Sequence, residues 1–137
     1  MIDIEQLKAD LRRDEGTRAK PYRDTVGKLT IGVGRNLDDV GLVPGEIELL
    51  LSNDTHTVVA ALNQHCPWWV ELPEPQGRAL ANMCFNLGVT RLLGFKKMLA
   101  ALEARQFHTA ADEALDSKWA RQVKGRATRI AALYRTT

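Results

Sequence analysis

The chain has 137 residues and a formal net charge of +2, which is enough for one domain with a core but not for two independent domains. No apolar run is long enough to cross a membrane, and the N-terminus lacks the basic and apolar regions of a signal peptide. We therefore expect a single domain, made in the cytoplasm and without a membrane anchor.

Basic residues gather near the C-terminus, although the net charge by itself is too small to indicate nucleic acid. Between Lys118 and Arg135 the chain carries several lysines and arginines and no acidic residue. Such a segment is typical of a solvated helix face with a few ion pairs. Alternatively, it attracts an anionic polymer, either nucleic acid or a cell-wall glycan that carries carboxylates.

The cysteines and histidines do not have the spacing of metal ligands. Cys66 and Cys84 form no disulfide framework, and Cys84 falls in an apolar helical pattern, which favours a buried free thiol. A Cys66–Cys84 disulfide is the alternative, and it does not suit a cytoplasmic product. We expect no metal and no cofactor.

The first predicted element is a helix over residues 3–15. Asp3 and Gln6 resemble a capping box, and Ile4, Leu7 and Leu11 recur at helical spacing. Glu15 falls next on the same face, before Gly16, which is a natural helix stop. Partial burial and the negative end of the helix dipole would favour protonated Glu15, as a general acid requires. Alternatively, Glu15 is an exposed glutamate paired with Arg12 or Arg18.

Two short strands, 18–22 and 28–33, are predicted next. They are joined by a four-residue turn that begins with Asp24 and ends with Gly27, a type I hairpin signal. Asp24 is then either a chemical group or a simple cap of this turn. Thr30 is an ordinary strand residue when taken alone. Gly32 and Gly34 indicate a close approach of backbone or ligand.

Helices account for the rest of the chain. A long helix is predicted from Pro44 to Gln64, followed by a turn-rich connection in which Trp68 and Trp69 cover the core or a lobe boundary. Further helices are predicted over 76–87, 95–105, 107–115 and 125–134, with their apolar faces inward. The N-terminal helix is expected to pack into this bundle, which would bring Glu15 to a boundary between lobes, a common place for ligand sites.

The stretch from Glu15 to Gly34 follows the pattern E-G-(x7)-D-(x2)-G-(x2)-T-I-G-x-G. It resembles the phage-type lysozymes of glycoside hydrolase family 24. The resemblance continues in RALANMCFNLG at 78–88, in GF at 94–95, and in SKW and GRATRI at 117–119 and 125–130. The resemblance implies an α+β, mainly α, lysozyme-like fold over residues 1–137. It would comprise a hairpin lobe (16–45), a linking helix (44–64), and a helical lobe (66–137) that also takes in the N-terminal helix 3–15.

The resemblance also implies a muramidase that cleaves the β-1,4 bond between N-acetylmuramic acid and N-acetylglucosamine in peptidoglycan. Glu15 would be the general acid, Asp24 the carboxylate that handles water or stabilises positive charge, and Thr30 a holder of that water. Family members are described as inverting, which requires carboxylates far enough apart to admit water. A closer pair would make Asp24 a nucleophile.

Other positions follow from the same resemblance. Asn36, Phe85, Glu113 and Arg126 would contact substrate, although Phe85 could equally be buried in its helix. Asn36, Glu113 and Met98 depart from the family's usual cleft residues. Arg126 would lie near Glu15 and, if it pairs with Glu15, would favour the ionised carboxylate. An Arg35–Asp54 ion pair between lobes is also expected, and it would persist as the pH rises past neutrality.

The leading hypothesis is thus a monomeric endolysin for host cell lysis, accumulating in the host cytoplasm and reaching the wall in the periplasm through a holin-like pore. A lytic transglycosylase is a second enzymatic hypothesis. A non-catalytic wall-binding or phage structural module and a nucleic-acid-binding helical domain are the alternatives from other classes, and no recognisable nucleic-acid motif accompanies the basic segment.

Overall fold

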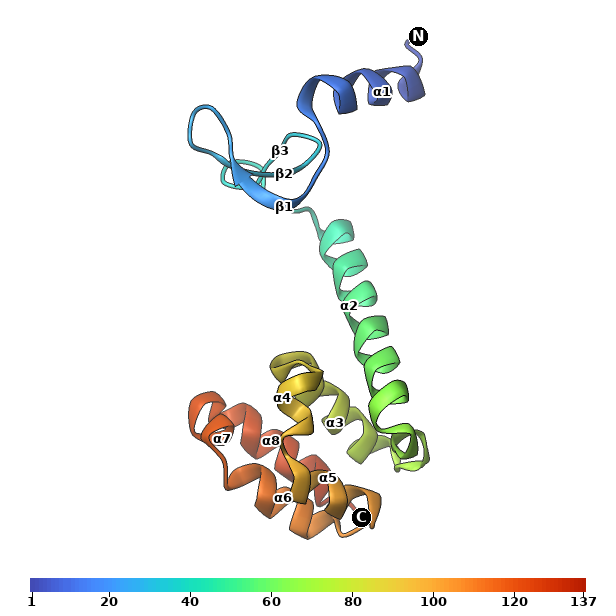
Figure 1. The fold of residues 1–137 in the computed structure, drawn as a ribbon, viewed down its shortest axis with the longest axis vertical. Helices are drawn as coiled ribbons and strands as arrows, with labels where there is room; N and C mark the ends of the chain where they lie inside the picture. The colour runs from blue at the N-terminus through green and yellow to red at the C-terminus, as the bar shows by residue number, and fades with distance from the viewer. The chain divides into compact units, whose positions relative to one another are not determined.

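A computed structural model describes all 137 residues of the chain (Figure 1). Its elements, in chain order, are α1 (Ile4–Glu15), β1 (Arg18–Arg23), β2 (Leu29–Gly32), β3 (Arg35–Asn36), α2 (Pro44–His65), the 3-10 helix η1 (Pro67–Glu71), α3 (Glu74–Leu87), α4 (Val89–Leu93), α5 (Lys96–Glu103), α6 (Phe107–Leu115), α7 (Lys118–Val123) and α8 (Gly125–Tyr134). The chain is therefore mainly helical, with one small sheet. None of the helices combines the length and apolar character that a membrane span requires.

The chain forms two compact units, Met1–Leu49 and Leu50–Thr137, and their boundary falls inside α2. The first unit contains α1 and the sheet. The predicted division into a hairpin lobe, a linking helix and a helical lobe that includes α1 stays a prediction.

In the first unit, α1 begins as its sequence predicts. The Asp3 carboxylate accepts a hydrogen bond from the backbone N–H of Gln6 at 3.0 Å, so Asp3 is the N-cap. At the other end, the Gly16 N–H donates to Arg12 O at 2.9 Å, and Gly16 has a φ of 76°. The helix has no buried residue, so its apolar side chains are not covered within their own unit.

The sheet has three antiparallel strands in the order β1-β2-β3. Thr30, on the central strand, pairs with Tyr22 on one side and with Asn36 on the other. A register shift lies between Arg18 and Tyr22 in β1. The first two strands confirm the predicted hairpin, but β3 was not predicted. A two-residue strand carries too little alternation to be recognised in a sequence.

The second unit contains the apolar core, which is built mainly from α3, α5, α6 and α8. Leu80 and Met83 of α3, Leu102 of α5 and Ile130 of α8 are almost completely buried. Helix α3 packs on α4 and α8, while α6 packs on α5, α7 and α8 (Figure 1). The predicted helices 107–115 and 125–134 are confirmed at both ends.

Three short helical elements of the second unit were not predicted: η1, α4 and α7. Each has only five or six residues, which is less than two turns and too short for a helical period to register. Trp68 and Trp69, in η1, are partly buried against the core, as expected for core-covering side chains. Cys66 and Cys84 are both buried free thiols.

Candidate active site

Glu15 is the last residue of α1, and its side chain is exposed. It makes no ion pair with Arg12 or Arg18. The guanidinium of Arg18 instead stacks on the Tyr22 ring, 4.8 Å from its centroid. Of the predicted alternative, an exposed glutamate paired with one of these arginines, the exposure is confirmed and the pairing is wrong. The partial burial expected around Glu15 is also not supplied by its own unit. The carboxyl group does lie close to Gly34: a Cβ added to Gly34 would be 3.0 Å from Oε2 of Glu15.

Asp24 begins the turn between β1 and β2, and its Oδ1 organises that turn. Oδ1 accepts hydrogen bonds from the backbone N–H of Val26 at 3.0 Å and of Lys28 at 2.8 Å. The N–H of Gly27 donates to Asp24 O at 3.0 Å, as the predicted four-residue turn requires. The structural role of Asp24 is confirmed, and Oδ2 accepts no hydrogen bond within the unit.

Thr30 lies on the central strand and is 3 % exposed, the one buried residue of the first unit. Its hydroxyl donates to the backbone carbonyl of Lys28 at 2.9 Å. The same carbonyl accepts from the N–H of Asp24 at 2.9 Å, while the N–H of Lys28 donates to Asp24 Oδ1. The Lys28 backbone thus connects Asp24 and Thr30. Sequence reasoning missed this link, and no signal could have revealed it, because any residue supplies these groups.

Asn36 lies in β3 opposite Thr30, and its amide closes the next loop. Its Nδ2 donates to Asp39 Oδ2 at 3.0 Å, and its Oδ1 accepts from the N–H of Asp39 at 2.9 Å. Lys28 also donates to Asp39, at 3.1 Å. This contact and the nearby carboxylate of Asp38 raise the pKa of Lys28 above its ordinary value. Asn36 therefore lies in the same sheet unit as Asp24 and Thr30, although its side-chain polar atoms are hydrogen-bonded to Asp39.

Arg35 has an ion-pair partner within its own unit. It pairs with Glu46, in the first turn of α2, at 2.7 Å, and also donates to Gly41 O at 3.1 Å. Oε1 of Glu46 also accepts a hydrogen bond from the N–H of Val43 at the start of the helix. The hydrogen bond raises the pKa of Arg35 and lowers that of Glu46. The predicted Arg35–Asp54 pair, whose members lie in different units, stays a prediction.

In the second unit, Phe85 and Arg126 line the same pocket, of about 320 Å³. Phe85 is 45 % exposed, so the alternative of burial in α3 is wrong. Arg126 is held by α3 as well, since its Nε donates to Asn82 Oδ1 at 3.0 Å. Of the predicted substrate contacts, the structure brings these two together. Pairing of Arg126 with Glu15 stays a prediction.

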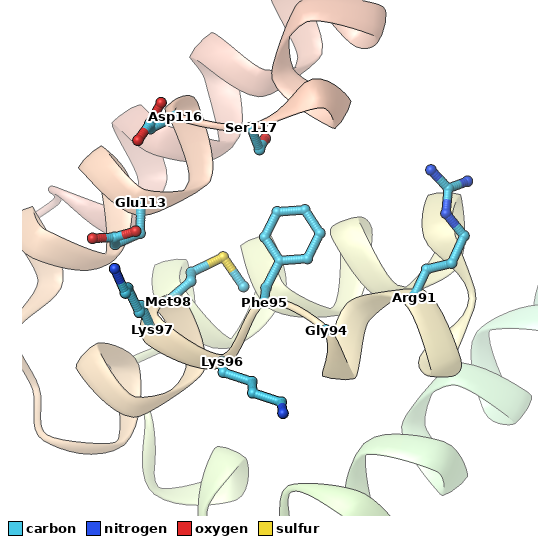
Figure 2. A pocket seen from close by; sticks show the side chains of 9 residues that line it. All are labelled: Arg91, Gly94, Phe95, Lys96, Lys97, Met98, Glu113, Asp116 and Ser117. Atoms are coloured by element: carbon cyan, nitrogen blue, oxygen red, sulfur yellow. The ribbon is translucent and has the colours of Figure 1, made fainter.

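Glu113 lines a different pocket of the second unit, of about 580 Å³, formed by α5, α6 and the segments beside them (Figure 2). Met98 and Phe95 supply its apolar floor, and the Phe95 ring meets Trp119 edge-on at 6.2 Å between centroids. Figure 2 shows Lys97 of α5 and Glu113 of α6 extending toward each other at the rim. Sequence reasoning missed Lys97 and Arg91 as lining residues, because exposed charged positions on a helix carry no distinguishing period.

The residues that could ligate a metal do not gather. No group of three or more histidine, cysteine, aspartate or glutamate side chains has the geometry of a metal site. The sheet unit carries two carboxylates, one exposed and one half-buried, and the helical unit carries two open pockets. Carboxylates at element ends, together with a polar strand residue, are suited to acid–base chemistry on a polymer.

The sheet unit and the helical unit together define an α+β, mainly α, protein of the lysozyme-like class. A model of the family described as phage lysozyme matches residues 12–135, and the chain belongs to this family. The sequence resemblance to phage-type lysozymes is therefore confirmed over most of its length.

Individual relatives cover the chain to different extents. The chain is 32 % identical to the pre-baseplate central spike protein Gp5 of Enterobacteria phage T4, over 92 % of the chain and 27 % of that protein. It is 27 % identical to the probable T4-type lysozyme 2 of Dictyostelium discoideum, over 97 % of the chain and 95 % of that protein. The SAR-endolysin of Bacteriophage PS119 is 36 % identical over 54 % of the chain and 46 % of its own length.

The chain therefore spans nearly the whole of one lysozyme relative but only about a quarter of the spike protein. The family and these relatives support a peptidoglycan-lytic function at the level of the class.

Proposed function

We propose that this chain is a muramidase that hydrolyses the β-1,4 bond between N-acetylmuramic acid and N-acetylglucosamine in peptidoglycan. Glu15 is the general acid, and Asp24 and Thr30 handle the attacking water. The observation that carries the proposal is the fixed link between Asp24 and Thr30 through the Lys28 backbone, in a chain that belongs to a lysozyme family.

The chemistry assigns each group one task. Glu15 transfers its proton to the glycosidic oxygen as the bond from this oxygen to the anomeric carbon breaks. Water adds to that carbon, and its proton passes to the Asp24 carboxylate. The hydroxyl proton of Thr30 is directed at Lys28 O, so Oγ1 is free to accept a hydrogen bond from the water. Oδ2 of Asp24 accepts no other hydrogen bond in its unit, which leaves it available for the water.

We propose an inverting reaction, in which the two carboxyl groups flank a space wide enough for water, about 6.5–9.5 Å apart. Anomeric proton NMR of the first product formed from a soluble glycan tests this. The inverted anomer is expected, and the retained anomer would make Asp24 a nucleophile instead.

Replacement of Glu15 tests the acid. Purified peptidoglycan is incubated with the parent, Glu15→Gln and Asp14→Asn, and the fragments are analysed by mass. Asp14 is the matched control, because it is an exposed carboxylate on the same helix that pairs with Arg13. Glu15→Gln is expected to lower the rate about 10²–10⁴-fold, while Asp14→Asn stays near the parent. Fragments with anhydro-muramic ends would indicate a transglycosylase. Equal activity of Glu15→Gln and the parent would rule out the mechanism.

Replacement of Asp24 separates its chemical role from its role in the turn. Asp24→Asn retains an Oδ1 that can accept from Val26 and Lys28 but loses the charge, whereas Asp24→Ala loses both. Both variants are expected to lower the rate of hydrolysis by a similar factor. Only Asp24→Ala is expected to shift the amide resonances of the turn in NMR spectra. If Asp24→Asn turned over at the parent rate, Asp24 would be a turn residue only.

Thr30 is tested by Thr30→Val, which keeps the shape of the buried side chain and removes the hydroxyl, and by Thr30→Ser, which restores it. Thr30→Val is expected to lower kcat more than it raises KM, and Thr30→Ser to recover most of the rate. Equal loss in both variants would point to packing of the side chain instead of to its hydroxyl.

We assign substrate contacts to Asn36, Phe85, Glu113 and Arg126. The exposure of Phe85 and its shared pocket with Arg126 support contact with a sugar ring, and the half-buried Glu113 beside Lys97 supports contact with a polar substituent. Phe85→Ala is expected to raise KM. The paired control is Leu115→Ala, another partly exposed apolar side chain, which lines neither pocket.

The biological setting completes the proposal. The chain acts as a monomer without a cofactor, in host cell lysis, and reaches the wall from the host cytoplasm through a holin-like pore. The name of the phage endolysin relative supports a part in cell lysis. Expression in a bacterial host with and without a pore-forming partner tests it: lysis is expected only with the partner. Lysis by the chain alone would reject the proposed route but leave the chemistry unchanged.

A further inference from the structure

Gly34 lies in the tight turn between β2 and β3, with a φ of 67°. A Cβ at this position would lie 3.0 Å from Oε2, 3.1 Å from Cδ and 3.2 Å from Cγ of Glu15. Such separations are shorter than ordinary van der Waals contact between these atoms. The carboxyl end of Glu15 therefore lies against the side of Gly34 on which any other amino acid would carry its Cβ.

The other left-handed glycines near the sheet do not have such a neighbour. Gly16, Gly27 and Gly32 have φ values of 76°, 84° and 68°, and a Cβ at any of them would meet nothing within 4 Å. Their conformation is sufficient to explain the choice of glycine. At Gly34 the conformation is the same, but an additional requirement applies, because the missing Cβ makes room for a side chain.

The carboxyl group of Glu15 has no hydrogen bond or ion pair in its own unit, so its position there depends on van der Waals contact. A Cβ at position 34 would crowd Cγ, Cδ and Oε2 of the side chain, so the carboxyl group would have to shift by a few tenths of an ångström. Such a shift approaches the tolerance of a catalytic geometry, which is about 0.5 Å.

We infer that Gly34 is a positioning residue for Glu15. Because Gly34 has no side chain, the carboxyl group of Glu15 packs against the turn between β2 and β3, and this packing determines where its proton is delivered. The inference deepens the proposed muramidase reaction and rests on it for the rate effects. The contact itself does not depend on that reaction.

Gly34→Ala and Gly32→Ala form a matched pair that tests the inference. Both alanines enter a left-handed conformation and carry the strain of that region, but only the Cβ at position 34 meets Glu15. Gly34→Ala is expected to lower kcat about 10–100-fold below Gly32→Ala, as displacement of a catalytic group does, with KM similar in the two variants. Equal kcat values would overturn the inference.

Asparagine tolerates the left-handed region better than alanine does. Gly34→Asn and Gly32→Asn therefore repeat the comparison with less strain, in case Gly34→Ala does not fold. The same difference in kcat is expected between the members of this second pair, and its absence would overturn the inference.

Coupling between the two positions provides a second readout. Glu15→Asp shortens the side chain by one methylene and withdraws the carboxyl group from the added methyl. In a double-mutant cycle, the loss in Gly34→Ala/Glu15→Asp is expected to be at least about fivefold smaller than the product of the single losses. Losses that multiply fully would show that residue 34 acts independently of Glu15.

A third readout requires no activity. With carbon-13 in the glutamate side chains, the Glu15 carboxyl resonance is assigned by its loss in Glu15→Gln. This resonance is expected to shift in Gly34→Ala and to stay unchanged in Gly32→Ala. If it shifts while Glu15→Gln retains full activity, the contact stands and the proposed mechanism fails. If it responds equally in both glycine variants, the positioning role fails.

Discussion

The sheet unit, Met1–Leu49, and the helical unit, Leu50–Thr137, differ in the forces that hold them. All of the buried apolar side chains lie in the helical unit, whereas the sheet unit buries only Thr30. In place of a core, the sheet unit has side-chain carboxylates, in particular those of Asp24 and Asp38, which accept hydrogen bonds from backbone N–H groups. The proposed catalytic groups thus occupy the unit whose geometry is set by directional polar contacts, and the helical unit contributes pockets on a rigid core.

This difference implies that the same kind of substitution has unequal effects in the two units. Removing apolar volume should destabilise the helical unit strongly and the sheet unit weakly. Removing a side-chain acceptor should disturb the sheet unit locally and leave the helical core intact. The following predictions test these statements in order of decreasing effect.

The largest effect is expected from a cavity in α3. Leu80→Ala removes a side chain with no exposed surface, and should lower the free energy of unfolding by about 2–5 kcal/mol. Leu49→Ala is the control, because Leu49 is 61 % exposed and should cost less than about 1 kcal/mol. Urea unfolding followed by circular dichroism measures both. Comparable losses would remove the contrast between the units.

An intermediate effect is expected at Trp119, which is buried and donates from Nε1 to Asn86 Oδ1 at 2.7 Å. Trp119→Phe loses this hydrogen bond and some volume and should cost about 1–2 kcal/mol. Trp69→Phe is the paired control, since its donation to Asn63 at 2.8 Å is exposed and water can replace it. In urea unfolding, a larger loss at Trp69 than at Trp119 would contradict the assignment of the core.

A smaller and local effect is expected at Asp38, whose Oδ2 accepts from the N–H of Leu29 at 2.8 Å. Asp38→Ala should speed hydrogen exchange at the Leu29 amide by up to about tenfold, which corresponds to a loss of about 1.4 kcal/mol of local stability. Asp38→Asn retains the acceptor and should change the rate less. Amides of α3 should exchange as in the parent, and parallel acceleration there would mean that the two units open together.

The smallest effect is a pH dependence at Glu46. The hydrogen bond from Arg35 holds the pKa of Glu46 below its ordinary value of 4.5. Because this pKa is depressed, the ion pair contributes stability that is complete above pH 4.5 and is lost as the pH falls through the folded-state pKa. The pair persists at alkaline pH, since the hydrogen bond to Glu46 raises the pKa of Arg35 above its ordinary, strongly alkaline value.

Carboxyl NMR titration measures this effect directly. Arg35→Gln should move the midpoint of Glu46 up toward 4.5, and Arg23→Gln, a change at a cation that pairs with Asp38 instead, should not move it. An unchanged midpoint in Arg35→Gln would mean that the hydrogen bond from the Val43 N–H accounts for the shift by itself.

Periodicity and capping were enough to predict much of the fold. The Asp3 cap, the Gly16 stop and the long apolar stripes are local features, so α1, α6 and α8 emerge with their predicted ends. The short elements β3, α4 and α7 depend on tertiary context and were missed. The turn at Asp24 was predicted because its chemistry is contained in four residues.

The site was predicted less completely, for a physical reason that differs between residues. Motif spacing singled out Glu15, Asp24 and Thr30, but their contacts involve backbone groups, which a sequence does not distinguish. The pairing of Arg35 with Glu46 was not predicted, because the loop geometry that brings these two residues together is not visible in the sequence. Gly34 was recognised as a point of close approach, and the side chain that approaches it became visible only in the structure.

The reactivity of the two buried thiols reports how often the packing of the helical unit opens. Burial raises the pKa of Cys66 and of Cys84, so neither offers much thiolate to a reagent in the folded state. Cys66 follows α2 and Cys84 lies within α3, so modification of either requires the packing around these helices to open. The rate of thiol labelling thus measures how often the scaffold opens, without a label being introduced and without reference to catalysis.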